Sequence, residues 1–265
     1  MRPRLLLLPC LLVAACGPTG ESAVVAGDER PSSSRYRVSA TVLESPGHGP
    51  QLCQAVAESY PPQCSGPDVV GWDWATAEGE ETANGTTWGA YEVTGTWDGT
   101  RLTLTEPPGP PRFHHPEGRV ELSTPCPEPD GGWLVMDRAA AGDEALARAQ
   151  ERAGSLPGFA GLWIDQSTGP VLNVRFTDDV EAAETELREV WGGALCVSPA
   201  ERSLAELQTI QAEVTTDETT FSSINAPANV VEVQVMVADP DHQAAYDARY
   251  GDGAVVVTGW LEPVD

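Results

Sequence analysis

The sequence contains no lysine: all 15 of its basic residues are arginines, against 40 acidic residues. Without an ammonium side chain, the chain cannot supply the lysine of a phosphate-binding loop or of a Schiff-base enzyme. The Ser-x-x-Lys pair of some acylating enzymes is also absent. ATP-driven and lysine-dependent chemistry is therefore excluded.

The shortage of basic residues gives the chain a formal net charge of −25. A surface this acidic repels nucleic acid and anionic lipid headgroups, so we expect no nucleic-acid partner. A cationic partner or divalent ions would fit the charge. We favour the simpler interpretation that the charge is a solvated surface that keeps an exported protein soluble.

Long apolar runs are also lacking, because no segment approaches the roughly 20 residues of a transmembrane helix. Instead the sequence begins with a basic tetrapeptide and a short apolar stretch, followed by Val13, Ala14 and Ala15 directly before Cys16. This layout is typical of a bacterial lipoprotein signal, whose cleavage leaves Cys16 as the first residue, acylated on its thiol. We therefore predict lipid attachment at Cys16 and a location on the extracytoplasmic face of the cell membrane. Ordinary secretion after cleavage at the same bond is the alternative.

Cysteine pairing follows from this location. Once Cys10 leaves with the leader and Cys16 is acylated, four cysteines remain: Cys53, Cys64, Cys126 and Cys196. An even number in an oxidising compartment predicts two disulfides, and four cysteines allow three pairings, among which sequence alone does not choose. We favour Cys53 with Cys64 and Cys126 with Cys196. A metal site is the competing interpretation, but the sequence has no Cys-x-x-Cys.

Composition divides the chain into four parts. Residues 1–16 are the predicted leader, and residues 17–35, rich in Gly, Ser, Pro and acids, are a predicted disordered tether. Residues 36–137 show strand patterns and predict a small all-β domain. Residues 138–265 show alternating helix and strand patterns and predict an α/β domain.

The β part contains one strong hairpin signal. Residues 36–42 alternate between apolar and polar, and residues 88–97 and 101–105 flank Asp98-Gly99, a pair that suits the positive φ of a tight turn. A small antiparallel sheet or barrel is expected. Its tryptophans are either a ligand-stacking platform or, as we favour, core residues: Trp72, Trp74, Trp88 and Trp97.

The α/β part is predicted to contain two repeats, at about residues 159–200 and 228–262. Strands are expected at 159–165, 171–176 and 194–197, with a helix at 179–191, and the order recurs about 60 residues later. Such units commonly pair into one sheet with helices on one face, in the ferredoxin-like manner. The expected fold class is therefore α+β, with a β sheet or barrel followed by a duplicated βαβ-type region.

Short polar signals mark the expected helix starts. Asp143 can cap a helix over residues 143–154, and Ser203 with Glu206 forms a capping-box pattern. We interpret the acidic residues at 178–179 and 239–241 as helix N-caps, placed at the positive end of the helix dipole, rather than as calcium ligands.

Catalytic residues are not evident. His114-His115 with Glu117 is the one cluster of imidazoles and a carboxylate, but adjacent strand residues point to opposite faces, so we favour an exposed loop. His48 and His242 have no identifiable partner. The sequence also lacks a Gly-x-Ser-x-Gly elbow and a His-Glu-x-x-His helix, so we predict no catalytic residue, metal ligand or cofactor.

Several segments resemble those of uncharacterised exported lipoproteins of high-GC Gram-positive (actinobacterial) bacteria: residues 39–53, 60–64, 88–89, 161–165, 191–197 and 248–251. The resemblance spans most of the mature chain and implies an envelope lipoprotein, but it carries over no activity. A weaker likeness links the C-terminal half to the tandem α/β prosegments of secreted serine proteases. No protease domain follows, so a prosegment role would act on another chain.

The leading hypothesis is a non-enzymatic lipoprotein that acts as a binding or structural component of the cell envelope, with an envelope protein or a small ligand as its partner. A protease inhibitor or prosegment-like folding helper is the second hypothesis, and a hydrolase with an unrecognised site is the third.

Overall fold

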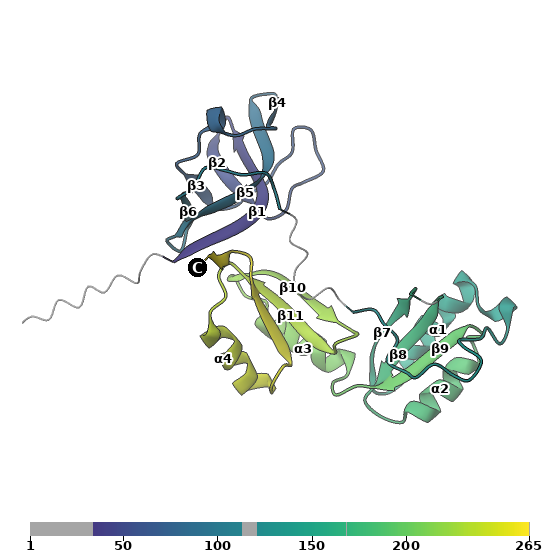
Figure 1. The fold of residues 1–265 in the computed structure, drawn as a ribbon. Helices are drawn as coiled ribbons and strands as arrows, with labels where there is room; N and C mark the ends of the chain where they lie inside the picture. The colour runs from purple at the N-terminus through teal and green to yellow at the C-terminus, as the bar shows by residue number, and fades with distance from the viewer. Residues whose placement is uncertain (1–33, 113–120, 168, 265) are drawn as a thin grey trace, which may run out of the picture. The chain divides into compact units, whose positions relative to one another are not determined.

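The computed structural model describes residues 34–112, 121–167 and 169–264 and arranges them as a mixed α+β fold that is mostly β (Figure 1). These residues contain 13 strands in three sheets and four α-helices. Two short 3-10 helices, η1 (Trp74–Thr76) and η2 (Arg138–Ala140), complete the elements. None of the helices in these ranges is long and apolar enough to cross a membrane.

The first sheet closes on itself. Its strand order is β13-β1-β2-β3-β6-β5-β4, and β1 also pairs with β5, so five strands form a closed ring. Closure leaves fewer exposed edges and encloses a core that includes Val42, Leu52, Val93 and Leu102. The strands are β1 (Arg35–Ser45), β2 (His48–Cys53), β3 (Asp68–Val70), β4 (Glu81–Ala83), β5 (Thr86–Trp97), β6 (Arg101–Leu104) and β13 (Glu262–Val264).

The hairpin predicted at Asp98-Gly99 is confirmed, since it joins β5 to β6. Gly99 has φ +99°, and the Asp98 carboxylate accepts hydrogen bonds from the backbone amides of Thr100 and Arg101. The sheet is not wholly antiparallel, however, because β3 and β6 run parallel. The chain crosses from β3 to β6 through β4 and β5 and so returns in the same direction.

The final strand belongs to the first sheet rather than to the α/β part that was expected to run to residue 265. β13 pairs antiparallel with β1, with Pro263 opposite Tyr36. β13 lies at the edge of the sheet, where a proline is tolerated because a missing N–H leaves no ladder bond unmade.

The second sheet is built from β7 (Phe159–Asp165), β8 (Val171–Phe176) and β9 (Ala194–Pro199). β7 and β8 form an antiparallel hairpin, and α2 (Val180–Arg188) carries the chain to β9, which is parallel to β8. One face packs against both α1 (Asp143–Ser155) and α2, in a core that includes Leu172, Phe176, Leu187 and Leu195.

The third sheet repeats this topology. β10 (Thr219–Asn225) and β11 (Val230–Val235) form the hairpin, and α4 (Pro240–Tyr250) leads to the parallel strand β12 (Val255–Gly259). α3 (Leu204–Val214) precedes the hairpin, as α1 precedes β7. Its core includes Leu207, Val214, Val231 and Val255.

The two βαβ units are present, but they do not join into the single ferredoxin-like sheet that was expected (Figure 1). Each βαβ unit is extended by a hairpin strand, β7 or β10, and by a preceding helix, α1 or α3. Its apolar face is therefore buried within the same repeat, and pairing with the other repeat is not needed to form a core.

Helix ends largely follow the sequence signals. Ser203 and Glu206 form a capping box at α3, and Asp179 and Asp239 cap α2 and α4 with their carboxylates. Asp143 is not a cap, because α1 begins at Asp143 itself and its N-cap, Gly142, makes no side-chain bond. α2 ends at Arg188, before the predicted end at residue 191.

Both favoured cysteine pairings are present. Cys53 bonds Cys64 and Cys126 bonds Cys196, each with Cα atoms 5.8 Å apart. The second bond attaches the segment before α1 to the face of the second sheet that the helices leave uncovered, where Trp133 also packs.

Candidate functional site

The two repeats meet at the turn between β10 and β11. Within this turn, Asn225 Oδ1 accepts from the Ala228 amide at 2.9 Å, and Asn229 has the left-handed φ of +59°. Asparagine tolerates this conformation better than most residues. The Ala226 side chain faces Gly161 of β7, where an added Cβ would lie 2.7 Å from the Ala226 Cβ.

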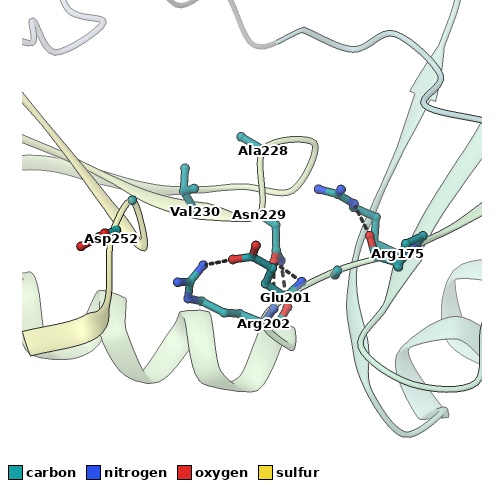
Figure 2. Close-up of a pocket in the computed structure, with 10 residues that line it drawn as sticks. Arg175, Glu201, Arg202, Ala228, Asn229, Val230 and Asp252 are labelled. Atoms are coloured by element: carbon teal, nitrogen blue, oxygen red, sulfur yellow. Dashed lines mark hydrogen bonds and ion pairs between the residues drawn. The ribbon is translucent and has the colours of Figure 1, made fainter. Parts of the chain in front are cut away.

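The side chain of Asn229 joins this turn to the segment between β9 and α3 (Figure 2). Its Oδ1 accepts from the backbone amides of Glu201 at 3.0 Å and Arg202 at 2.9 Å. Its Nδ2 donates to the Arg202 carbonyl at 2.8 Å. Asn229 is 4% exposed, so these bonds satisfy a buried amide and fix the backbone that carries both charged residues.

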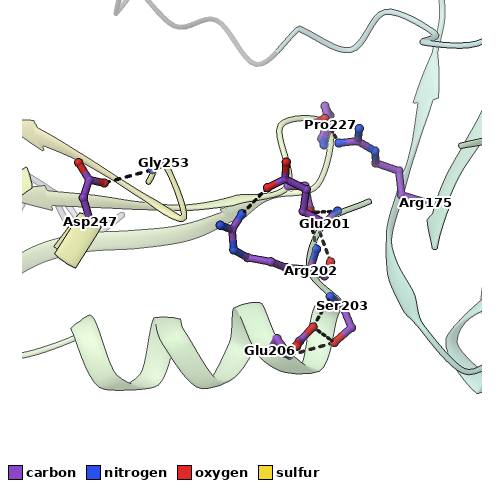
Figure 3. A network of polar contacts seen from close by, with 9 residues as sticks. Arg175, Glu201, Arg202, Ser203, Glu206, Pro227, Asp247 and Gly253 are labelled. Atoms are coloured by element: carbon purple, nitrogen blue, oxygen red, sulfur yellow. Dashed lines mark hydrogen bonds and ion pairs between the residues drawn. The ribbon is translucent and has the colours of Figure 1, made fainter. Parts of the chain in front are cut away.

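We call the β10–β11 turn and the segment between β9 and α3 the joint between the repeats. Arg175, on β8, contacts both parts of this joint (Figure 3). Its Nε donates to the Pro199 carbonyl at 3.1 Å, and its Nη1 donates to the Pro227 carbonyl at 2.6 Å. Among the described residues it forms no ion pair with a carboxylate. Burial lowers the pKa of its guanidinium, and the charge of Glu201 partly offsets this, but arginine remains protonated.

Arg202 is the second guanidinium of the joint. Its side chain is 19% exposed and pairs with Glu201, whose carboxylate lies 3.2 Å away on a side chain that is 82% exposed. The Ser203–Glu206 capping box starts α3 directly after Arg202 and so holds its backbone in place. Hydrogen bonds from Ser203 lower the pKa of the Glu206 carboxyl.

A cavity of about 390 Å³ opens among these groups (Figure 2). The loop after α4 contributes Asp252 and Gly253, and the Gly253 amide donates to Asp247 Oδ1 at 3.1 Å. The remaining lining residues are apolar or belong to the network just described: Arg175, Pro199, Ala200, Glu201, Arg202, Ala228, Asn229 and Val230.

The lining combines basic, acidic and apolar groups. It contains two guanidiniums, which donate to carboxylate or phosphate oxygens, beside an apolar wall. Among the described residues it contains no serine, cysteine or histidine, and its acid–base groups are the carboxylates of Glu201 and Asp252. The cavity can hold a small molecule in a fixed orientation.

A second cavity, of about 540 Å³, lies beside Trp97 and Met236, with Asp217 and His242 among its lining residues. Its imidazole is already engaged, because His242 Nδ1 accepts from the Asp239 amide in the capping box of α4. Its other polar lining residues are Thr100, Asp217, Glu218 and Thr220, and no arginine of the described ranges lines it.

Several residues singled out from the sequence lie outside the described residues, namely Cys16, His114, His115 and Glu117. The expectation that His48 and His242 lack partners is wrong. His48 Nε2 lies 3.6 Å from Asp68 Oδ1, and His242 contributes to a helix cap. Within the described ranges, no three His, Cys, Asp or Glu side chains are grouped to hold a metal ion.

The tryptophans of the first sheet are mainly structural. Trp72, Trp74 and Trp97 are partly buried and pack against the core of this sheet, as we favoured. Trp88 instead makes an edge contact with Tyr60, with ring centroids 5.7 Å apart. Trp88 is not among the side chains packed against this core.

The two arginines of the joint were missed by sequence reasoning. They lie 27 residues apart in different elements, and no motif connects them. The Asn-Ala-Pro-Ala-Asn sequence of the turn was the one usable signal, since asparagine and proline mark a structured turn. No known family matches the chain, and no curated protein matches it.

Proposed function

We propose that the chain is a membrane-anchored extracytoplasmic lipoprotein that acts by binding rather than by catalysis. The observation that carries the binding role is the cavity between the repeats, which combines two guanidiniums with an apolar border. Such pockets, concave and apolar with a few converging polar groups, are the usual form of a small-molecule site.

The location rests on the predicted lipid attachment at Cys16. The small residues before Cys16 and the short apolar stretch fit a lipoprotein signal, and the two disulfides agree with an oxidising compartment. Each buried methylene contributes about 0.8 kcal/mol, so two or three acyl chains, palmitate among them, attach a protein to a membrane durably. The proposed tether between the lipid and the first sheet is the segment predicted at residues 17–35, whose last residue, Arg35, is the first residue of β1.

We also propose that the two repeats are a duplicated unit. Each has the order helix, hairpin, helix, strand, and in each the hairpin is antiparallel and the last pair is parallel. Duplication supports a binding role because it creates a joint to which both copies contribute side chains. The cavity lies at this joint.

The anchor is tested by metabolic labelling with an alkyne-bearing palmitate in a bacterial host that processes lipoproteins. The wild-type chain should take up the label, and its amino-terminal peptide should carry the acyl groups at Cys16 by mass spectrometry. Cys16→Ala should abolish the label, whereas Cys10→Ala, which alters a cysteine within the leader, should retain it. An intact, unmodified amino terminus on soluble intracellular protein would contradict the proposal.

A further inference from the structure

The charge of the chain makes the cavity between the repeats unusual. With a net charge of −25, the molecule repels anions over most of its surface. Arg175 and Arg202 nevertheless line one cavity, and the first of them bonds only backbone carbonyls in the described structure. Two of its five N–H groups are used in this way, so the others remain available to a ligand.

The Glu201 carboxylate pairs with Arg202 in the way that the oxyanion of an acidic ligand would. Its carboxylate lies 3.2 Å from Nη1, yet its side chain is 82% exposed and no other bond to that carboxylate is found among the described residues. An exposed ion pair of this kind contributes little, because water and salt screen it and both side chains lose freedom. A ligand oxyanion can therefore replace Glu201 at little cost.

The apolar lining limits the ligand further. Pro199, Ala200, Ala228 and Val230 border the cavity beside the guanidiniums. Asp252 lies in the loop after α4 and repels a second negative group. A cavity of about 390 Å³ is also larger than a bare inorganic ion requires.

We propose that this cavity binds a small organic anion with one carboxylate or phosphate group and an apolar body, that Arg175 and Arg202 hold its oxyanion, and that Glu201 competes with it. The inference rests on the proposed binding function and specifies its ligand. Charge-assisted bonds from guanidinium to carboxylate or phosphate are the strongest hydrogen bonds in proteins, and the apolar body gains from leaving water.

The test is calorimetric titration of the full mature chain in detergent micelles, with micelles alone as the blank. The probes are benzoate and phenyl phosphate, with benzyl alcohol as the uncharged analogue and inorganic phosphate as the head group alone. Saturable binding of benzoate or phenyl phosphate is expected, and which one binds more tightly identifies the oxyanion. Benzyl alcohol and inorganic phosphate should bind at least about tenfold more weakly.

Variants assign the binding to the cavity. Arg202→Gln and Arg175→Lys should each weaken binding about tenfold, the lysine because it keeps the charge but loses the planar fork. Glu201→Gln should tighten binding about threefold, because it removes the competing carboxylate. Arg148→Gln, an exposed position on α1, makes the same charge change elsewhere and should leave the affinity within twofold.

Three results would overturn the inference: no saturable binding of either charged probe, equal binding of benzyl alcohol, or affinity that Arg202→Gln and Glu201→Gln leave unchanged. Because Glu201 is exposed, its variant should fold normally and keep the test decisive even if Arg175→Lys unfolds the joint. Acylation at Cys16 is measured separately. Its presence without probe binding would overturn this inference and leave the proposed location standing.

Discussion

The side chain of Asn229 hydrogen-bonds both backbone polar groups of Arg202. Its Oδ1 accepts from the Arg202 amide at 2.9 Å, and its Nδ2 donates to the Arg202 carbonyl at 2.8 Å. One side-chain amide therefore satisfies the backbone N–H and C=O of Arg202, as a neighbouring strand satisfies those of a strand residue. The backbone that carries this guanidinium is consequently fixed by a residue from the second repeat.

Replacing Asn229 should loosen the joint. We expect Asn229→Ala to lower the free energy of unfolding by about 3 kcal/mol, because three hydrogen bonds are lost and buried backbone groups are left unpaired. The left-handed φ of +59° adds a penalty of about 1 kcal/mol for alanine. Asn229→Gly is the matched control, since it loses the same bonds without that penalty, and urea denaturation at neutral pH measures both. An alanine variant within about 0.5 kcal/mol of wild type would contradict this account of the joint.

Asp165 makes stability depend on pH. Hydrogen bonds from Ser167, and more weakly from Thr124, hold the pKa of the Asp165 carboxyl at about 2, below its ordinary value of 3.8. A carboxyl whose folded pKa is lowered stabilises the fold above its ordinary pKa, and the contribution disappears as pH falls towards the folded pKa. We therefore expect Asp165→Asn to destabilise the protein at pH 6 and to differ little from wild type near pH 2.

The measurement is the urea midpoint of both proteins at several pH values between 6 and 2. Asp130→Asn, which removes an exposed carboxylate from the same region of the chain, is the control for the charge change alone. A difference between Asp165→Asn and wild type that stays constant over this range would show that the carboxylate contributes no pH-dependent stability.

Local signals predicted local structure well. The Asp98-Gly99 pair identified its hairpin because the positive φ at Gly99 is a property of the turn itself. The Ser203 and Glu206 pair identified the start of α3 for a similar reason, since both groups that form the box lie within four residues. The two βαβ crossovers were also visible as a change of hydrophobic period.

Long-range pairing was not predictable in the same way. β13 contains Pro263 and is three residues long, so nothing in its sequence indicates that it pairs with a strand more than 200 residues away. The separation of the repeats into two sheets depends on which edge each strand meets, and strand patterns do not encode this. Arg175 and Arg202 line one cavity only because the Asn229 turn meets both of their segments, so the candidate site could not be found before the fold.

The two disulfides should contribute differently to stability. Cys126–Cys196 closes a separation of 70 residues and Cys53–Cys64 one of 11, and longer loops lose more unfolded-state entropy. The chain-entropy relation gives about 4 kcal/mol for the first and about 3 kcal/mol for the second. We expect Cys126→Ala/Cys196→Ala to lower the free energy of unfolding more than Cys53→Ala/Cys64→Ala, as measured by urea denaturation. The reverse order would indicate that the segment before α1 stays attached to the second sheet without its disulfide.

Gly161 provides the space into which Ala226 fits, and this contact can be measured on its own. Gly161 has φ +141°, and an added Cβ would lie 2.7 Å from the Ala226 Cβ, so Gly161→Ala should cost about 2 to 3 kcal/mol from backbone strain and overpacking. Gly169→Ala has a similar strain, at φ +114°, but its added Cβ meets nothing within 4 Å, so it should cost only about 1 kcal/mol.

Adding Ala226→Gly to Gly161→Ala should recover the difference in cost between the two glycine variants, because it removes the methyl group that the new Cβ meets. A double-mutant cycle by urea denaturation measures this coupling, and additive effects would mean that the turn does not press against β7 in solution.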